Sequence, residues 1–160
     1  MQVIIMSRAA LMELAKDPFP PGTAVISITN SDAADVELCH MPEQILRLKF
    51  DDVSDEIYED FLGRKPTVRE MHQLSARFHM LSDHQAQQLA DFILSRNNQG
   101  ILICQCEHGQ SRSAGIAAAA VEYYLHRGVH IFADPRYCPN KYVFRKLLRN
   151  LRTKGGQRCP

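Results

Sequence analysis

The chain has 160 residues, of which 45% are hydrophobic and 23% are charged, and its formal net charge at pH 7 is +1. This length fits one domain with a packed core, and the near-neutral charge excludes a broad positive field for nucleic acid or anionic lipid. No apolar run approaches the roughly 20 residues of a membrane span, and the N-terminal residues lack the basic region of a signal peptide. Five cysteines without framework spacing predict free thiols in a reducing, cytoplasmic compartment.

The N-terminal third predicts strands that alternate with a helix. Three short apolar runs predict buried strands, at residues 3–7, 24–29 and 45–50. Residues 8–17 have helical spacing, and the apolar face of this helix is predicted to hold Leu11, Leu14 and Ala15. Residues 30–35 predict a turn.

The middle and the C-terminal part predict several helices. Capping-box sequences begin two of them, at Thr67 to Glu70 and at Ser82 to Gln85. The apolar stripe of the second one consists of Ala86, Leu89, Phe92 and Ile93. A fourth strand is predicted at 101–105, followed by helices at 113–128, ended by Gly128, and at 141–151.

Strands that alternate with helices predict an α/β fold of three layers. We expect a mainly parallel, twisted sheet of about four to five strands, flanked by helices. Residues 1–152 are expected to form a single domain, and residues 153–160 a flexible tail. Ligands bind at the carboxyl ends of the strands in such sheets, and the segment after the fourth strand and the acidic cluster at 51–56 both lie at such ends.

The segment CEHGQSR at 106–112 places a thiol, a glycine and a guanidinium between the fourth strand and the next helix. The spacing from cysteine to arginine arises readily by chance, so its context carries the argument. Gly109 permits backbone angles that other residues avoid, and a short loop at a helix N-terminus turns its N–H groups inward as an anion nest. Arg112 adds a planar fork for two phosphate oxygens, and Ser113 can donate to the sulfur. Cys104, inside the strand, is expected to be a core residue.

The sequence CEHGQSRSAG at 106–115 resembles the signature loop of the cysteine-dependent protein tyrosine phosphatases, particularly the compact dual-specificity branch. That family has Cys, five residues, Arg and then Ser or Thr between a strand and a helix. The resemblance extends more loosely over residues 45–127, and the segment 139–148 also resembles small bacterial or phage members. It implies a phosphatase-like fold and hydrolysis of phosphomonoesters through a phosphocysteine, without a metal ion or another cofactor.

The resemblance also implies a role for each residue of the loop. The thiolate of Cys106 attacks phosphorus, Arg112 and the loop amides hold the equatorial oxygens, and Ser113 helps the sulfur leave. The substrate-binding residues are then Glu107, His108, Gly109, Gln110, Ser111 and Arg112. Many family members have histidine just before the cysteine. Gln105 has that position here and is expected to hydrogen-bond to loop carbonyls, and His108 is a candidate substitute donor.

Cleavage of a phosphate ester also needs a proton for the leaving oxygen. The sequence LRLKFDD at 46–52 resembles the family segment that supplies an aspartate, which assigns the acid to Asp52, with Asp51 and Asp55 as alternatives. A merely solvated acidic loop is the other interpretation of this cluster. Residues 53–82 include an extra segment relative to the shortest family members, which is either a helical flap over the pocket or a core helix.

The loop has one basic residue, Arg112, beside Glu107, which disfavours a highly charged inositide. We expect a phosphotyrosine or mixed phosphoprotein substrate, or a small phosphomonoester, with no nucleic acid or membrane partner and an undetermined oligomeric state. Candidate walls for the pocket are Tyr58, Phe61 and Phe78. Three other functions remain open: a rhodanese-like sulfurtransferase, an RNA 5′-phosphatase and a catalytically silent phosphate-binding module.

The cysteines suggest a redox hypothesis, because a thiolate oxidises readily. Cys104 and Cys106 are expected to point to opposite faces of their strand, which disfavours a disulfide between them. Cys138 is therefore the better candidate to pair with an oxidised Cys106.

Overall fold

The computed structural model describes residues 1–54, 59 and 63–156, without the side chains of 74–76. Four strands of this part form one sheet in the order β1-β4-β2-β3, and each neighbouring pair is parallel. The strands are β1 (Gln2–Ser7), β2 (Thr23–Thr29), β3 (Gln44–Lys49) and β4 (Ile101–Cys106). The helices are α1 (Arg8–Leu14), α3 (Val68–Arg77), α4 (Asp83–Ser95), α5 (Arg112–Leu125), α6 (Val129–Ala133) and α7 (Lys141–Lys154).

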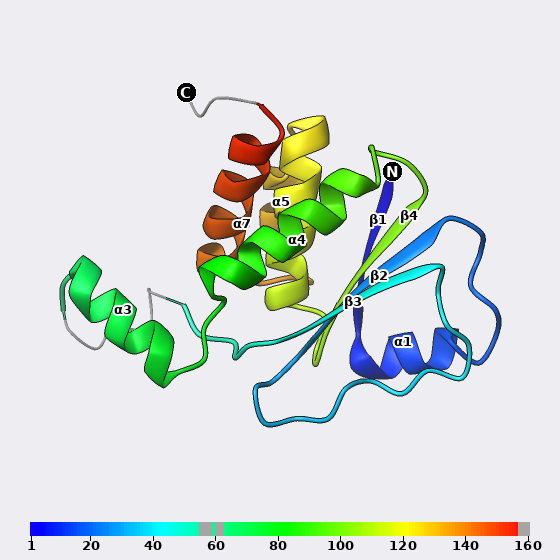
Figure 1. The fold of residues 1–160 in the computed structure, drawn as a ribbon, viewed down its shortest axis with the longest axis horizontal. Coiled ribbons are helices and arrows are strands. Elements are labelled where there is room, and N and C mark those ends of the chain that lie inside the picture. Colours follow the sequence, from blue (N-terminus) through cyan, green and yellow to red (C-terminus); the bar gives the residue numbers. More distant parts are fainter. Residues whose placement is uncertain (55–58, 60–62, 157–160) are drawn as a thin grey trace.

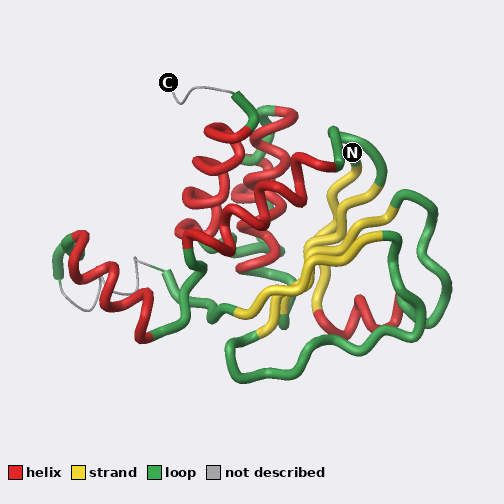
Figure 2. Tube along the Cα trace, in the orientation of Figure 1, coloured by secondary structure: helices red, strands yellow, loops and turns green. Residues whose placement is uncertain are grey.

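The sheet separates two helical layers (Figures 1 and 2). On one face α4, α5 and α7 cover a large core that includes Leu102, Ile116 and Leu147. On the other face α1 packs through Leu11 against a smaller core that includes Ile103. Leu102 and Ile103 are neighbours on β4, so both faces of this strand are buried, as in other parallel sheets covered by helices. The predicted three-layer α/β fold is confirmed, with four parallel strands in the described residues.

The four predicted strands match the observed ones within one residue at each end, but two helical predictions are wrong. Helix α5 ends at Leu125 and not at Gly128, because His126 takes the left-handed conformation with φ of 53°. Gly128 instead precedes α6, which the sequence did not predict. Leu14 is 39% exposed, unlike Leu11, because it is the last residue of α1 and lies at the margin of the narrow apolar stripe.

Both predicted capping boxes form. Ser82 Oγ accepts a hydrogen bond from Gln85 N at 3.1 Å, and Gln85 Oε1 accepts one from Ser82 N at 3.0 Å. Glu70 likewise accepts from Thr67 N at 2.7 Å, and Thr67 Oγ1 accepts from Glu70 N at 3.3 Å. The pKa of Glu70 is lowered to about 2, first by the hydrogen bond from Arg64 and then by those from Thr67.

Helix α3 projects from the body of the molecule (Figure 1). None of its described side chains belongs to either buried cluster, and Val68 is 77% exposed. Of the two interpretations left open for residues 53–82, the core helix is therefore wrong for α3.

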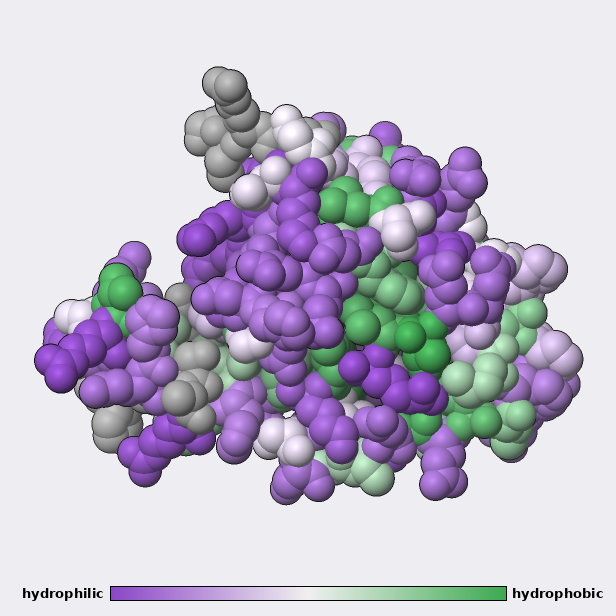
Figure 3. Space-filling view, viewed as in Figure 1, coloured by the Kyte–Doolittle hydropathy of each residue, from purple (hydrophilic) through white to green (hydrophobic). Residues whose placement is uncertain are grey.

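The C-terminal helix α7 continues to Lys154, whose ammonium contacts the carboxylate of Asp91 on α4. It passes the predicted domain boundary at residue 152 by two residues. Residues 157–160 of the predicted tail lie outside the described part, so the flexible tail stays a prediction. Hydrophilic side chains cover α4 in Figure 3, and hydrophobic ones gather over the edge strand β3. In the part of the chain that the structure describes, no helix has the length and apolar character for a membrane crossing.

Candidate active site

The segment between β4 and α5 turns sharply, since residues 107–111 form a series of bends. Gly109 has φ of 69°, a conformation that side-chain-bearing residues rarely adopt. A Cβ atom at this position would lie 2.5 Å from the backbone nitrogen of Ser7 and 2.6 Å from the carbonyl carbon of Met6. Glycine is thus required both by the turn and by the close approach of the loop to the end of β1.

The backbone N–H groups of residues 108–111 have no hydrogen-bond acceptor among the residues that the structure describes. The first helical hydrogen bond of α5 runs from Gly115 N to Ser111 O at 2.8 Å, so the N–H groups of its first turn also lack helical acceptors. The carbonyl oxygens of Gln110 and Ser111, in contrast, accept from Cys138 N at 3.0 Å and Asn140 N at 3.1 Å. The loop therefore fixes its carbonyls and leaves its N–H donors available to an anion.

Cys106 lies at the start of this loop, and its Sγ is 3.0 Å from Ser113 Oγ. Cys104 is fully buried, as predicted, and burial raises the pKa of its thiol, with a smaller contribution from the neighbouring Cys106. Both cysteines belong to the same core cluster. The expectation that they point to opposite faces is wrong, because residues two apart on a strand share a face.

Arg112 is buried, with only 3% of the residue exposed. Its Nη1 donates to Phe50 O at 2.7 Å, just beyond the end of β3. Its Nε is buried without a hydrogen-bond partner among the described residues. An unpaired buried donor costs free energy, so this N–H group is left unsatisfied by the described residues.

The carboxylate of Asp52 lies beside the same loop. Its Oδ1 accepts from Ser111 Oγ at 2.7 Å and from Asn140 Nδ2 at 3.0 Å. The structure therefore brings the predicted acid next to the thiol loop, although 59 positions separate Asp52 from Ser111 in the sequence.

The two alternative acids have different outcomes. The carboxylate of Asp51 accepts hydrogen bonds from the backbone N–H of Ser31 at 2.9 Å and from its hydroxyl at 3.0 Å. Asp51 thereby fixes the loop that follows β2, and within the described part of the chain it makes no hydrogen bond or ion pair with the thiol loop. Asp55 lies outside the described residues and stays an alternative.

Sequence reasoning missed Asn140, a residue that is only 6% exposed. Its Oδ1 accepts from Val143 N at 3.0 Å as the N-cap of α7. Its Nδ2 donates to Asp52 Oδ1 at 3.0 Å and to Val53 O at 3.3 Å, and its backbone N–H donates to Ser111 O. The sequence signals an N-cap here, because asparagine precedes a helical pattern, but not the contact with Asp52.

Gln105 does not take the role expected of it. It is fully buried, and its Oε1 accepts from Ser27 Oγ on β2 at 2.7 Å. Its Nε2 is buried without a partner in the described part of the chain. The predicted hydrogen bond to loop carbonyls is wrong, because alternation along β4 directs Gln105 to the face opposite Cys106.

The remaining candidates lie at the periphery of the loop. Glu107 Oε2 is 3.8 Å from Arg8 Nη1, and Glu107 O accepts from Arg8 N at 3.1 Å, which joins the loop to α1. His108 is exposed and has no hydrogen bond to Cys106 among the interactions of the described residues. Of the aromatic candidates, Phe78 is half-buried beside the Arg77 guanidinium, 5.4 Å from its ring centroid. The other two, Tyr58 and Phe61, lie outside the described residues.

No protein-family model matches this chain, and no curated protein matches its sequence. Solved structures do match. Human DUSP28 is 14% identical with a TM-score of 0.54, over 98% of this chain and 95% of that chain. A mouse putative dual specificity phosphatase, complexed with zinc tungstate, is 15% identical with a TM-score of 0.52, over 97% of this chain and 85% of that chain. PTPMT1 is 15% identical with a TM-score of 0.52, over 98% of this chain and 93% of that chain.

Identities this low establish the fold and leave the activity to be argued from the site. The likeness confirms the fold that the resemblance implied: the chain has the fold of the cysteine-dependent protein tyrosine phosphatases, in its dual-specificity form.

Proposed function

We propose that this protein is a phosphomonoester hydrolase that acts through a phosphocysteine on Cys106. The observation that carries the proposal is the convergence of three kinds of group at one loop. The Cys106 thiol lies 3.0 Å from the Ser113 hydroxyl. Loop N–H groups and the Nε–H of Arg112 lack protein partners in the described residues, and the Asp52 carboxylate lies beside them. A nucleophile, an oxyanion site and a proton donor are the parts that phosphoryl transfer requires.

In the first step the Cys106 thiolate attacks phosphorus and forms the S–P bond. The bond from phosphorus to the leaving oxygen breaks, and protonated Asp52 gives its proton to that oxygen. The Arg112 Nε and the loop N–H groups bind the other phosphate oxygens throughout. In the second step water attacks phosphorus, Asp52 takes a proton from it, and the S–P bond breaks. The Ser113 hydroxyl donates a hydrogen bond to the departing thiolate.

Two contacts hold the acid segment against the signature loop and support this assignment. Phe50 O accepts from Arg112 at 2.7 Å, and Asp52 accepts from Ser111 at 2.7 Å, two residues further along the segment. The same stretch of backbone thus positions the guanidinium and the proton donor relative to each other. Effective positioning of reacting groups accounts for a large part of enzymatic rate enhancement.

The preferred substrate class is phosphotyrosine or a mixed phosphoprotein, with a small phosphomonoester as the alternative. Arg112 is the one basic residue in the segment 106–112, and Glu107 next to Cys106 adds a negative charge. A highly charged inositide would therefore find few cationic partners within this segment. The cytoplasmic location stays a prediction from the cysteines, of which Cys39, Cys104, Cys106 and Cys138 are free.

Hydrolysis of para-nitrophenyl phosphate tests the proposal. Wild type should release phosphate, and Cys106→Ser should lose at least about a thousandfold in kcat because it lacks the nucleophile. The serine variant should still bind tungstate, a tetrahedral oxyanion like phosphate that the mouse structure also contains. Cys39→Ser, which removes an exposed thiol, should retain the rate and serves as the control.

The alternatives give distinct results in the same assay. Full activity in Cys106→Ser overturns the proposal. Formation of thiocyanate from thiosulfate and cyanide indicates a sulfurtransferase, and release of phosphate only from 5′-phosphorylated RNA indicates an RNA phosphatase. Tight oxyanion binding by wild type without any turnover indicates a silent phosphate-binding module.

A further inference from the structure

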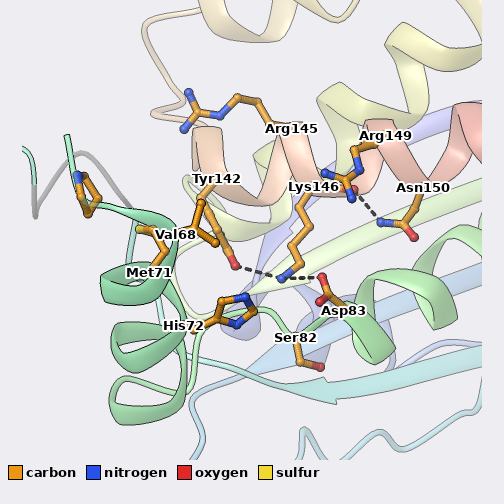
Figure 4. A pocket seen from close by; sticks show the side chains of 11 residues that line it. Val68, Met71, His72, Ser82, Asp83, Tyr142, Arg145, Lys146, Arg149 and Asn150 are labelled. Atoms are coloured by element: carbon orange, nitrogen blue, oxygen red, sulfur yellow. Dashed lines mark hydrogen bonds and ion pairs between the residues drawn. The ribbon is translucent and has the colours of Figure 1, made fainter. Parts of the chain in front are cut away.

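A cavity of about 710 Å³ lies outside the candidate active site, between α3, α7 and the start of α4 (Figure 4). The side chains that define its character come from all three helices. They are Val68 and Met71 of α3, Asp83 of α4, and Arg145, Lys146 and Arg149 of α7.

The charges around this cavity are predominantly positive. Among the described residues that line it are three basic side chains and one carboxylate, which together have a formal charge of +2 when His72 is counted as neutral. The pKa of Asp83 is lowered, first by the hydrogen bond from Lys146, next by the charge of Lys146 and then by Arg149 and His72. Arg149 is exposed. Its guanidinium makes no hydrogen bond or ion pair with the described residues, so this group is available to a ligand.

The floor of the cavity is fixed by Lys146, whose side chain is only 18% exposed. Its Nζ donates to Leu81 O and to Tyr142 Oη, each at 2.9 Å, and forms an ion pair with Asp83 at 3.0 Å. These contacts fasten α7 to the start of α4. The opposite wall is apolar in part, because α3 presents Val68, which is 77% exposed, and Met71, next to the imidazole of His72. A cationic side therefore faces an apolar side across one cavity.

We propose that this cavity binds an acidic peptide segment. On the proposed function, the segment belongs to the phosphoprotein substrate and flanks the phosphorylated residue. Carboxylates of the segment pair with the guanidinium of Arg149, and the methylene groups of glutamate contact Val68 and Met71.

The position of the cavity along α7 fits a substrate segment. Asn140, at the start of α7, contacts Asp52 of the candidate site. At 1.5 Å per residue, Arg145 and Arg149 lie about 8 Å and about 14 Å further along the helix axis, distances that an extended peptide covers with about two to four residues. A nucleic acid fits less well, because the chain carries a net charge of only +1 and the Tyr142 ring already has the Lys146 ammonium 5.1 Å from its centroid.

Fluorescence anisotropy in the Cys106→Ser background tests binding without catalysis. The probe is a fluorescein-labelled decapeptide rich in glutamate and aspartate, compared with its glutamine and asparagine counterpart and with an oligothymidylate. The acidic peptide should bind, and its affinity should fall as the salt concentration rises. Arg149→Glu should lower this affinity about tenfold. Arg149→Gln should have a smaller effect in the same direction. Asp83→Asn, which removes the carboxylate from the lining, should strengthen binding severalfold.

Arg127→Glu is the matched control, because Arg127 is exposed and lies outside the cavity, and the substitution changes the net charge equally. Equal weakening by Arg127→Glu and Arg149→Glu would overturn the site, as would equal binding of the neutral peptide or tighter binding of the oligothymidylate.

A kinetic comparison separates this inference from the proposed function. With active enzyme, a phosphotyrosine peptide with acidic flanking residues should have a higher kcat/KM than the neutral-flanked peptide, and Arg149→Glu should bring this ratio towards one. Turnover of both peptides with a ratio of one in wild type refutes the acidic-segment site and leaves the hydrolase proposal intact. Selective binding of the acidic peptide without turnover of either peptide refutes the hydrolase proposal and the idea that the segment belongs to a substrate. The assignment of the cavity as a site for acidic peptides then remains.

Discussion

Asp52 is held by only one of its two carboxylate oxygens. Oδ1 accepts both hydrogen bonds, from Ser111 and from Asn140, and Oδ2 has no hydrogen-bond donor among the described residues. One oxygen thus anchors the group, and the other is free to carry the transferred proton. Proton transfer from a positioned acid contributes about 10²- to 10⁴-fold to a rate.

Asp52→Asn should therefore lower kcat for a phosphotyrosine peptide by about 10²-fold or more. The loss should be smaller for para-nitrophenyl phosphate, because its leaving group needs less protonation. Asp51→Asn is the control, since its carboxylate contacts Ser31, and it should retain most of the rate. Steady-state kinetics with both substrates provides the measurement, and equal losses in the two variants would contradict the assignment of the acid.

Asn140 combines a structural and a positioning role that two substitutions separate. Asn140→Ala should destabilise the fold by about 1 kcal/mol through loss of the α7 cap, and should also lower kcat for phosphotyrosine. Asn140→Ser retains a capping hydroxyl but does not reach Asp52, so its stability should stay near wild type while kcat falls about tenfold. Thermal unfolding and steady-state kinetics measure both. A serine variant with unchanged kcat would limit Asn140 to its capping role.

The candidate site residues that lie close together in the sequence were predictable from their own segment, and Asp52 was proposed from the resemblance of a second segment to the family. Cys106, Arg112 and Ser113 fall within one short segment whose context indicates an anion site. Asn140 was missed because 88 positions separate it from Asp52, and no local pattern reports such a contact. Gln105 was assigned to the wrong partner because Ser27 comes from another strand.

At the scale of single elements, the turn from β4 to α5 depends on Gly109. Its positive φ and its approach to the backbone of Met6 and Ser7 both exclude a side chain. The signature loop therefore has its shape before any ligand arrives, as an oxyanion site needs.

Gly109→Ala should destabilise the fold by more than about 1 kcal/mol and abolish most of the activity, because the loop must move away from β1. Gly156→Ala is the control: Gly156 has φ of 76°, but no atom lies within 4 Å of an added Cβ. Gly156→Ala should destabilise the fold by about 1 kcal/mol, which is the cost of the backbone conformation alone, and should leave kcat unchanged. Urea unfolding and phosphatase assays compare the two variants, and equal effects of both would argue against the close packing of the loop.

The start of α3 should depend on pH through Glu70. Its pKa is lowered to about 2 in the folded protein, from an ordinary value of 4.5, first by Arg64 and then by Thr67. A lowered carboxyl pKa contributes stability that is present above about pH 4.5 and is lost as pH falls towards 2. Glu70→Ala should therefore lower the amide-exchange protection of α3 at pH 6 but have little effect near pH 2.

Glu37→Gln provides the comparison for this measurement, because Glu37 is exposed and distant in sequence from α3. It should leave the protection of α3 unchanged at both values of pH. A Glu70→Ala difference that is as large near pH 2 as at pH 6 would exclude the carboxylate as the source of the stability.

Strands and capping boxes were predictable because their signals are local: alternation, apolar runs and a residue pair three positions apart. Helix α6 and the end of α5 were not. Gly128 suggested the end of the helix, whereas the left-handed conformation falls on His126. Histidine is enriched at positive φ but rarely adopts it, so its presence alone does not predict a helix end.

At the scale of the whole molecule, the parallel sheet brings separate segments to one edge. Asp52 follows the carboxyl end of β3, and Cys106 is the last residue of β4. Asn140 directly precedes α7, which belongs to the helical layer that covers the sheet (Figure 1). The three-layer arrangement followed from the order of the predicted elements. The contacts among these segments did not, because they depend on the packing of side chains in three dimensions.

The packing of α7 should thus affect the stability of the fold and the position of Asn140 beside Asp52. Leu147 is fully buried in the main core, so Leu147→Ala should destabilise the fold by about 2–5 kcal/mol. Leu125→Ala, a change at a position that is 47% exposed, should cost much less. Chemical denaturation gives both values, and similar costs would contradict the observed burial.

The central claim is that Cys106 forms a covalent bond to phosphorus, and a trapping experiment tests it most directly. Excess enzyme is mixed with a phosphotyrosine peptide, quenched in acid within milliseconds and analysed by mass spectrometry. The account predicts a transient phosphate on Cys106 that accumulates before free phosphate appears and is absent from Cys106→Ser. Release of phosphate with no covalent intermediate on Cys106, or with the phosphate on another residue, would contradict it.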